Sequence, residues 1–172
     1  SVHGETLHNH NHANLMKTGD VMVLDAGVET PNKCASDITR TIPVGGTFTP
    51  QQRQIYEMVL RAQLASIKAI KPGVPYKDVH LLAARSFATD LKAAGLMKGD
   101  VGEAVAGGAH ALFFPHGLGH MIGLDVHDLE NIGEQYVGYE PGVERSQQFG
   151  LGYLRLARTL KPGFVVTVEP GL

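Results

Sequence analysis

Histidines and carboxylates are the residues of this chain whose types and spacing could do chemistry. The sequence has nine histidines, and six of them fall in two clusters, which are His8, His10, His12 and His116, His120, His127. Imidazole and carboxylate groups are common ligands of divalent metals, and two such ions about 3.5–4 Å apart can activate a shared water near neutral pH. The clustering therefore points to a metal-dependent site, which also needs carboxylates directed inward.

Two aspartates lie at the ends of predicted strands. Residues 21–26 form a short apolar run rich in strand formers, and residues 37–42 alternate polar with apolar side chains. The segment between them is polar and contains a proline, which suits a hairpin connection. We therefore expect an antiparallel pair in which Asp25 and Asp37 could converge. The alternative is that both aspartates only end their strands.

The motif HGLGH, residues 116–120, places two histidines four positions apart. This spacing occurs in helical zinc motifs, but the required glutamate is missing, and the glycines and Pro115 disfavour a helix. Glycines beside His120 would instead allow the backbone to approach a ligand closely, as in the wall of a site. Alternatively, these histidines and His127 are ordinary hydrogen-bonded residues of the core or the surface.

Glu169 directly follows residues 164–168, which we predict to be a buried strand. A carboxylate at the end of a buried strand is costly unless it is paired or bound to a metal. Glu169 is therefore a candidate ligand, although it could also turn outward into solvent.

Two helices should position these residues. Thr49 followed by Pro50 predicts a capped helix that runs to about residue 70, and a second helix is expected from about Tyr76 to Ala94, ending at Gly95. Residues 104–128 are rich in glycine and histidine and should be irregular. We expect a loop over 136–152 and a short helical turn over 153–160. This mixture of paired strands and paired helices predicts an α+β domain.

Composition narrows the classes of function. The chain has 172 residues, is 43% hydrophobic and has a formal net charge of -2, which suits a single globular domain and gives no electrostatic footprint for nucleic acid. No apolar run is long enough to span a membrane. The single cysteine, Cys34, cannot form an internal disulfide and favours a reducing compartment, so we expect a cytoplasmic location.

Five motifs in order resemble a known family. LDAG with Asp25, SDITRT with Asp37, HGLGH with His120, LDVHD with His127 and TVEPG with Glu169 closely resemble the metallopeptidases of the pita-bread fold, in the aminopeptidase P and prolidase branch. The resemblance covers essentially the whole chain. It implies an antiparallel sheet covered by helices and a single catalytic domain, 1–172, taken from the C-terminal part of a longer parent chain.

The resemblance also implies a site with two metals, most commonly Mn²⁺, with Co²⁺ or Zn²⁺ as alternatives. Four metal ligands would be Asp25, Asp37, His120 and Glu169, and a fifth, a glutamate, would lie beyond Leu172. We therefore expect the domain to be truncated at both ends, which would put metal occupancy and activity in question.

The implied reaction is attack by a metal-bridging hydroxide on the carbonyl before proline, with Glu169 handling the proton. His8, His116 and His127 resemble residues that contact the substrate and stabilise the tetrahedral intermediate. The expected partners are proline-containing dipeptides or oligopeptides, and the parent protein is expected to be a homodimer.

Arg155 bears on the choice between the two branches. The surrounding segment resembles a prolidase insertion in which an arginine at this place binds the terminal carboxylate of a dipeptide, a task for which the planar guanidinium fork is suited. Some aminopeptidase P relatives share the insertion, and Arg155 could instead form a structural salt bridge. Both substrate classes therefore stay open, with a slight preference for the dipeptide.

Two other functions compete with a peptidase. A pita-bread protein that has lost its metals could act as a binding module, although retention of four ligands argues against it. A mononuclear iron oxygenase would need two histidines and one carboxylate, and it would leave Asp25, Asp37 and Glu169 without a role.

Overall fold

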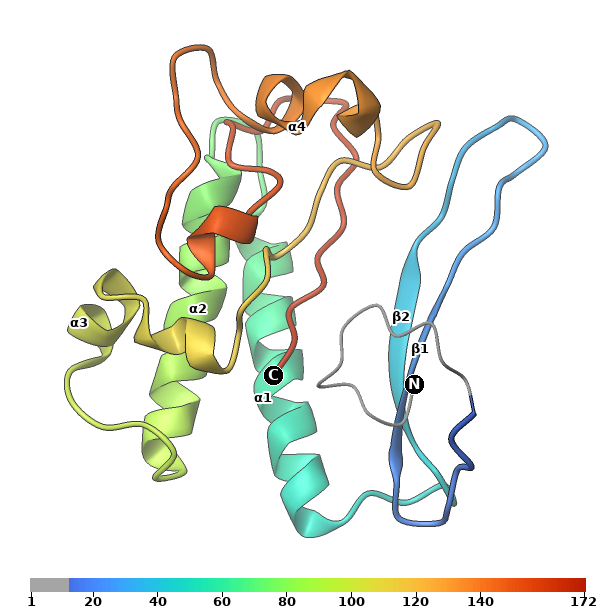
Figure 1. Cartoon of the computed structure of the whole chain (residues 1–172), viewed down its shortest axis with the longest axis vertical. Helices are drawn as coiled ribbons and strands as arrows, with labels where there is room; N and C mark the ends of the chain where they lie inside the picture. The colour runs from blue at the N-terminus through green and yellow to red at the C-terminus, as the bar shows by residue number, and fades with distance from the viewer. Residues whose placement is uncertain (1–12) are drawn as a thin grey trace.

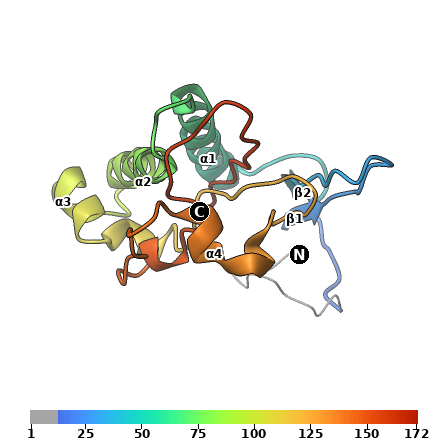
Figure 2. The same ribbon diagram turned by 90° about the horizontal axis from the view of Figure 1, so that it is seen from above.

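The computed structural model describes residues 13–172. Its elements are, in chain order, β1 (Val21–Ala26), β2 (Ile38–Pro43), α1 (Pro50–Ala69), α2 (Tyr76–Ala93), α3 (Val101–Ala106), the 3-10 turn η1 (Ala109–Leu112), α4 (Glu130–Gly138) and the 3-10 turn η2 (Leu151–Tyr153). Figures 1 and 2 both show α1, α2 and α3 on one side of the molecule and the β1–β2 hairpin on the other. The expected α+β class is confirmed.

Strands β1 and β2 form the predicted antiparallel hairpin. Asp25 pairs with Thr39, and β2 begins at Ile38, one residue later than expected, so that Asp37 precedes the strand. Both strands are half-buried or exposed. The hairpin loop is tied to the rest of the chain where the Ala35 amide donates to the Gly123 carbonyl at 2.8 Å.

Helix α1 begins where the sequence predicted. The Thr49 hydroxyl accepts a hydrogen bond from the Gln52 amide, and the Gln52 side chain accepts one from the Thr49 amide. This reciprocal arrangement satisfies two amide groups that the first turn would otherwise leave unpaired, and Pro50 fits the first position because its missing N–H is not needed there.

Helix α2 contributes more buried side chains to the core than any other element. It ends as expected before Gly95, whose φ of 76° closes the helix in the left-handed conformation that glycine tolerates. Its buried face carries Phe87, which packs edge-on against Phe114 with ring centroids 5.1 Å apart. Phe114 and Leu118 are both fully buried, so the core reaches up to the segment that carries His120.

Two extended segments, residues 118–122 and 165–169, run antiparallel beneath the helices. The Glu169 amide donates to the Leu118 carbonyl at 2.8 Å, and the Thr167 amide donates to the His120 carbonyl at 2.9 Å. Side chains of α1 and α2 cover this pair: Gln63 donates to the Val168 carbonyl at 3.1 Å, and the Tyr76 hydroxyl donates to the Thr167 carbonyl.

The prediction of a buried strand over 164–168 is wrong in part. The segment is extended, but it is only half-buried, Val165 is 60% exposed, and one isolated bridge joins Val166 to Met121. Among the described residues, its regular backbone hydrogen bonds run only to 118–122. A strand paired on one edge keeps much of its surface open.

The expectations for 136–160 are also partly wrong. Residues 136–138 belong to α4 rather than to a loop. Residues 154–160 form no helical turn beyond η2, because their backbone groups bond across to the start of α2: the Tyr76 amide donates to the Arg158 carbonyl, and the Leu160 amide to the Val74 carbonyl, both at 2.9 Å. Tertiary hydrogen bonding has replaced the local i to i−4 pattern.

Candidate metal centre

Three of the predicted ligands converge. The Nε2 atom of His120 lies 3.2 Å from Oδ2 of Asp37 and 3.2 Å from Oε1 of Glu169. One ligand atom from each residue lies within 4.8 Å of the others, which is close enough for all three to face one cation. The histidine is 3% exposed, whereas the carboxylates are half-buried. The residues come from the end of the hairpin loop and from the two extended segments.

The backbone fixes the orientation of the His120 ring. Its Nδ1 atom lies 2.9 Å from the Met121 carbonyl, which can only accept a hydrogen bond, so Nδ1 carries a proton. In the neutral ring, Nε2 then presents its lone pair to the space shared with Asp37 and Glu169. This tautomer is the one that a metal-ligating histidine needs.

Thr167 holds two members of the cluster together. Its hydroxyl accepts the His120 amide at 3.0 Å and donates to Oε1 of Glu169 at 2.9 Å. Sequence analysis missed this residue, although a signal was available, since Thr167 lies two positions before Glu169 in an extended segment and so faces the same side.

The ionisation of the cluster favours positive charge at its centre. Burial lowers the pKa of His120, but the hydrogen bond to Glu169 and the nearby carboxylates raise the pKa above its ordinary value. Burial raises the pKa of Glu169, yet bonds from His120 and Thr167 hold that pKa below its ordinary value. Protonation of His120 is therefore favoured by the carboxylates, and a divalent cation that displaced this proton would meet the same donors.

Asp25 lies at the edge of the cluster. Burial, followed by the negative charges of Asp25 and Glu169, raises the pKa of Asp37, so the Asp25 carboxylate is close to it. Asp25 is exposed and is not one of the three residues whose ligand atoms lie within 4.8 Å of one another. The predicted convergence of Asp25 and Asp37 is therefore seen, while a place for Asp25 among the ligands stays a prediction.

His127 and Arg155 lie next to the cluster. The His127 ring packs edge-on against the His120 ring, with centroids 4.3 Å apart. Nη1 of Arg155 lies 3.3 Å from Nδ1 of His127, and it also donates to the Glu130 carboxylate. Burial, the positive charge of His120 and that of Arg155 lower the pKa of His127. Arg155 thus forms the salt bridge that the sequence left as an alternative, and it does so beside the site.

His116 lies near Glu169 and the residues that follow it. Its Nδ1 atom is 2.9 Å from the Gly117 carbonyl, and its ring packs edge-on against Phe114 at 4.9 Å between centroids. A Cβ atom placed on Gly171 would lie 3.0 Å from Nε2 of His116, so Nε2 faces the turn after Glu169. The charge of His116 is among the smaller influences that lower the pKa of Glu169. His8 lies outside the described residues.

The glycine beside His120 has a different role from the one expected. A Cβ atom on Gly119 would collide with the Thr167 carbonyl and lie 2.7 Å from the Tyr76 hydroxyl. Gly119 therefore allows the two extended segments to come together under α2, rather than allowing the backbone to approach a ligand. Close packing of backbone on backbone sets the position of His120.

Two other histidines are buried away from the cluster. His80 and His110 are both 0% exposed, and their ring centroids lie 6.3 Å apart. Burial, together with the charge of His110, lowers the pKa of His80 to about 3, and neither ring nitrogen of His80 has a hydrogen-bond partner among residues 13–172. Both rings are thus neutral packing groups. Sequence spacing gave no sign of them.

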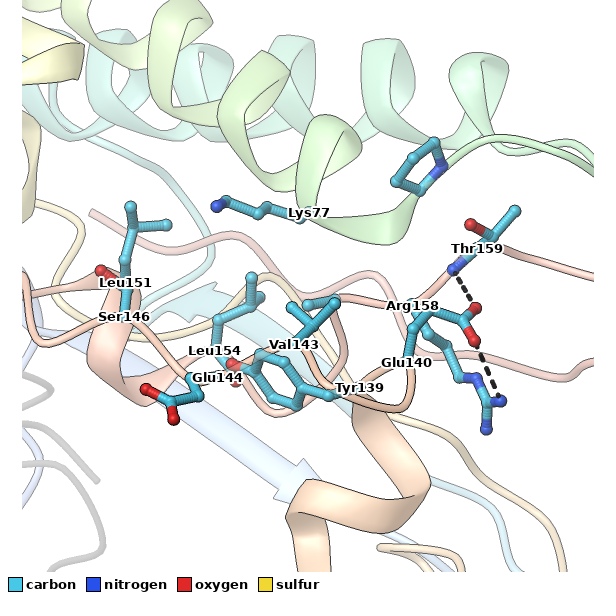
Figure 3. A pocket seen from close by; sticks show the side chains of 12 residues that line it. Lys77, Tyr139, Glu140, Val143, Glu144, Ser146, Leu151, Leu154, Arg158 and Thr159 are labelled. Atoms are coloured by element: carbon cyan, nitrogen blue, oxygen red, sulfur yellow. Dashed lines mark hydrogen bonds and ion pairs between the residues drawn. The ribbon is translucent and has the colours of Figure 1, made fainter.

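A separate cavity of about 200 Å³ lies between the start of α2 and the segment 139–159 (Figure 3). Its wall includes Lys77, Tyr139 and Leu154, with Glu140 accepting the Thr159 amide at 3.2 Å. The residues that line it do not include the three of the cluster, so it is not the metal centre.

In the described part of the chain, no helix is both long and apolar enough to cross a membrane.

Comparison with known proteins identifies the class. Residues 1–172 match the metallopeptidase family M24. The chain is 45% identical over 158 residues to the Xaa-Pro dipeptidase of Homo sapiens, an alignment covering 91% of this chain and 30% of that protein. It is 38% identical over 170 residues to Xaa-Pro aminopeptidase 2 of Streptomyces coelicolor, covering 99% and 32%. The chain therefore belongs to the metallopeptidase family M24.

The structure gives the more particular likeness. It matches zinc-substituted E. coli aminopeptidase P in complex with product with a TM-score of 0.79 and 38% identity, covering 98% of this chain and 34% of that one. The fold is the pita-bread fold of aminopeptidase P, as the motifs implied. The chain spans about a third of the length of these relatives.

Proposed function

We propose that this protein is a metal-dependent peptidase that hydrolyses the bond before proline. The observation that carries the proposal is the convergence of Asp37, His120 and Glu169 with their ligand atoms within 4.8 Å of one another. The relatives named Xaa-Pro dipeptidase and Xaa-Pro aminopeptidase support the substrate class.

The donor set supports a pair of divalent ions. We assign Asp37, His120 and Glu169 as ligands, and Asp25 as a fourth that borders them. Oxygen-rich sites of this kind suit Mn²⁺, with Co²⁺ and Zn²⁺ as alternatives. When bound, such ions act as Lewis acids on the substrate carbonyl and lower the pKa of water so that it can attack near neutral pH.

Residues of the chain would supply the remaining chemistry. Glu169 is held ionised by His120 and Thr167, so it can take a proton from the attacking water and pass it to the leaving nitrogen. His127, beside the cluster, can donate to the carbonyl oxygen as negative charge develops on it. His116 holds its Nδ1 proton on the Gly117 carbonyl, so it can donate from Nε2 only when both ring nitrogens are protonated. His8 is assigned to substrate binding by the family resemblance, and Arg155 lies where it can contact the part of the substrate after proline.

The location and assembly of the protein are part of the same proposal. We assign it to the cytoplasm, supported by the single cysteine, Cys34, which is exposed and has no second cysteine with which to form an internal disulfide. The family resemblance supports a longer chain in which residues 1–172 form one catalytic domain. It also supports a homodimer, and sedimentation velocity would test that oligomeric state.

Metal content and peptide hydrolysis together test the function. With added Mn²⁺ we expect cleavage before proline in glycyl-proline or in a longer Xaa-Pro-Xaa peptide, with loss of both metal and activity in D37N and E169Q. The matched control is E57Q, because Glu57 forms an exposed pair with Arg53 on α1. Peptide binding without metal and without turnover would instead identify a binding module.

A further inference from the structure

Glu130 stands out because it is a carboxylate that the proposed chemistry does not use, although it reaches the edge of the site. We propose that Glu130 is a specificity-determining residue: it occupies the Arg155 guanidinium and disfavours substrates that bring their own carboxylate there. This inference rests on the proposed function and refines its substrate class. It assigns the site to longer Xaa-Pro-Xaa peptides rather than to Xaa-Pro dipeptides.

The ion pair between Glu130 and Arg155 is sheltered from solvent. Oε2 of Glu130 accepts from Nη1 of Arg155, and the Glu130 side chain is only 13% exposed, against 36% for Arg155. The same oxygen lies 3.7 Å from Nδ1 of His127. A half-buried pair is weakened less by solvent than a surface pair, so Glu130 offsets much of the positive charge of Arg155.

The backbone places Glu130 at this point. Leu129 has a φ of 59°, a left-handed conformation that is uncommon for leucine, and α4 starts at the next residue. The Glu130 amide donates to the His127 carbonyl at 3.3 Å. The turn therefore directs the first side chain of α4 back toward His127 and Arg155.

The position of Arg155 is fixed from the other end of α4. The Ala157 amide donates to the Gly138 carbonyl at 2.7 Å, and a Cβ atom on Gly138 would collide with the Arg155 carbonyl. The start of α4 thus binds the side chain of Arg155, and its end binds the backbone beside it. This double attachment limits how far Arg155 can turn away from Glu130.

The charge balance decides which substrates fit. Arg155 reaches His127, which packs on His120, so its guanidinium lies within reach of a peptide held at the metal centre. A dipeptide that ends in proline presents a free carboxylate just after the bond to be cut, whereas a longer peptide presents a neutral amide. Glu130 repels the carboxylate and already accepts from Nη1, but it leaves other N–H groups of Arg155 for a carbonyl.

The test compares ligands that differ only in the terminal charge. Isothermal titration would measure binding of glycyl-proline and glycyl-prolinamide to the metal-free protein, for the wild type and E130Q. In parallel, kcat/KM would be measured with Mn²⁺ for glycyl-proline and for a tripeptide Xaa-Pro-Xaa. We expect E130Q to raise the preference for the free carboxylate about tenfold in both assays, mainly through KM. Removing the negative charge of Glu130 ends its repulsion of the substrate carboxylate and strengthens the charge-assisted hydrogen bond from Arg155 to that carboxylate.

Two further variants separate specificity from structure. Glu134 lies on the same helix as Glu130, α4, and forms a comparable ion pair with Arg145. E134Q should therefore leave the preference for the free carboxylate unchanged. The double variant E130Q/R155M should lose the gain, because the cation that binds the carboxylate is gone. An unchanged or lowered preference for glycyl-proline in E130Q would overturn the inference, as would the absence of measurable binding of either ligand. Absence of hydrolysis by the wild type, with the binding shift still present, would instead count against the proposed function alone.

Discussion

The hydroxyl of Thr167 lies 2.9 Å from Oε1 of Glu169 and accepts the backbone amide of His120 on its other side. One small side chain therefore sets the distance between two candidate ligands that come from different segments. Outer-shell partners of this kind commonly contribute about 10–100-fold to metal affinity.

We expect T167V to weaken Mn²⁺ binding by about 10–100-fold, because the isosteric change removes both hydrogen bonds and frees the Glu169 carboxylate to rotate. Titration of Mn²⁺ into each protein, followed by isothermal calorimetry, would measure the two affinities. T89V serves as the control, since within residues 13–172 the Thr89 hydroxyl donates to the Arg85 carbonyl of its own helix and to no candidate ligand. Equal affinities in T167V and the wild type would show that Thr167 does not position the ligands.

Metal binding should release a proton near pH 6.5. Burial alone lowers the pKa of His120, but the Glu169 carboxylate raises that pKa above its ordinary value of 6.5. More than half of the rings are therefore protonated at pH 6.5, and the ring must become neutral to bind a metal. Affinity should therefore rise as pH increases through the raised pKa of His120 and level off above it. Calorimetry in buffers of different ionisation enthalpy would count the proton, and a pH-independent affinity would contradict this.

The His80 ring should make the fold sensitive to acid. Burial lowers its pKa to about 3 from an ordinary 6.5, so the folded state resists protonation. The stability that this neutral ring permits is complete above pH 6.5 and is lost as pH falls from there toward 3. The expected loss from this group is about 2 kcal/mol between pH 7 and pH 5.

Urea unfolding at several pH values would measure that loss. H80M keeps an apolar side chain of similar size beside Phe114 and removes the titrating group, so its stability should fall less on acidification. An identical fall in the wild type and in H80M would assign the acid sensitivity to other residues, of which His110 is the first to test because burial also lowers its pKa.

The close approach at Gly119 predicts a steric effect on the fold. An alanine there would place its methyl group against the Thr167 carbonyl and 2.7 Å from the Tyr76 hydroxyl. We expect G119A to destabilise the protein by about 2–3 kcal/mol and to weaken metal binding, because His120 is the next residue. G102A, whose methyl would meet only a side-chain oxygen of Asp100 at 3.1 Å, should change stability by less than about 1 kcal/mol. Thermal unfolding of both variants and of the wild type would measure these changes in stability.

Local patterns in the sequence predicted the parts of the fold that local physics determines. Thr49 and Pro50 marked the start of α1 because capping depends on neighbouring residues alone, and Gly95 marked the end of α2 for the same reason. The alternation in residues 37–42 placed β2 to within one residue. Motif order also indicated Asp37, His120 and Glu169, which the structure brings together.

Other features depended on contacts that local patterns do not contain. Residues 154–160 have a sequence compatible with a helical turn, yet they bond to the start of α2. Glu130 was overlooked because only the left-handed turn at Leu129 directs it toward Arg155. The buried pair of His80 and His110 was also missed, since one lies on α2 and the other on η1 and only tertiary packing joins them.

Helix α4 is interrupted at Gly133, whose φ of 135° and ψ of 115° break the helical path between Glu130 and Glu134. The half that carries Glu134 and Gly138 holds the framework of the following segment, whereas the half that carries Glu130 touches only the rim of the site. Evolution could therefore alter residues 130–132, and with them the charge presented to a peptide, without disturbing the anchored half. In this sense the break at Gly133 makes substrate choice a separable and adjustable trait of the fold.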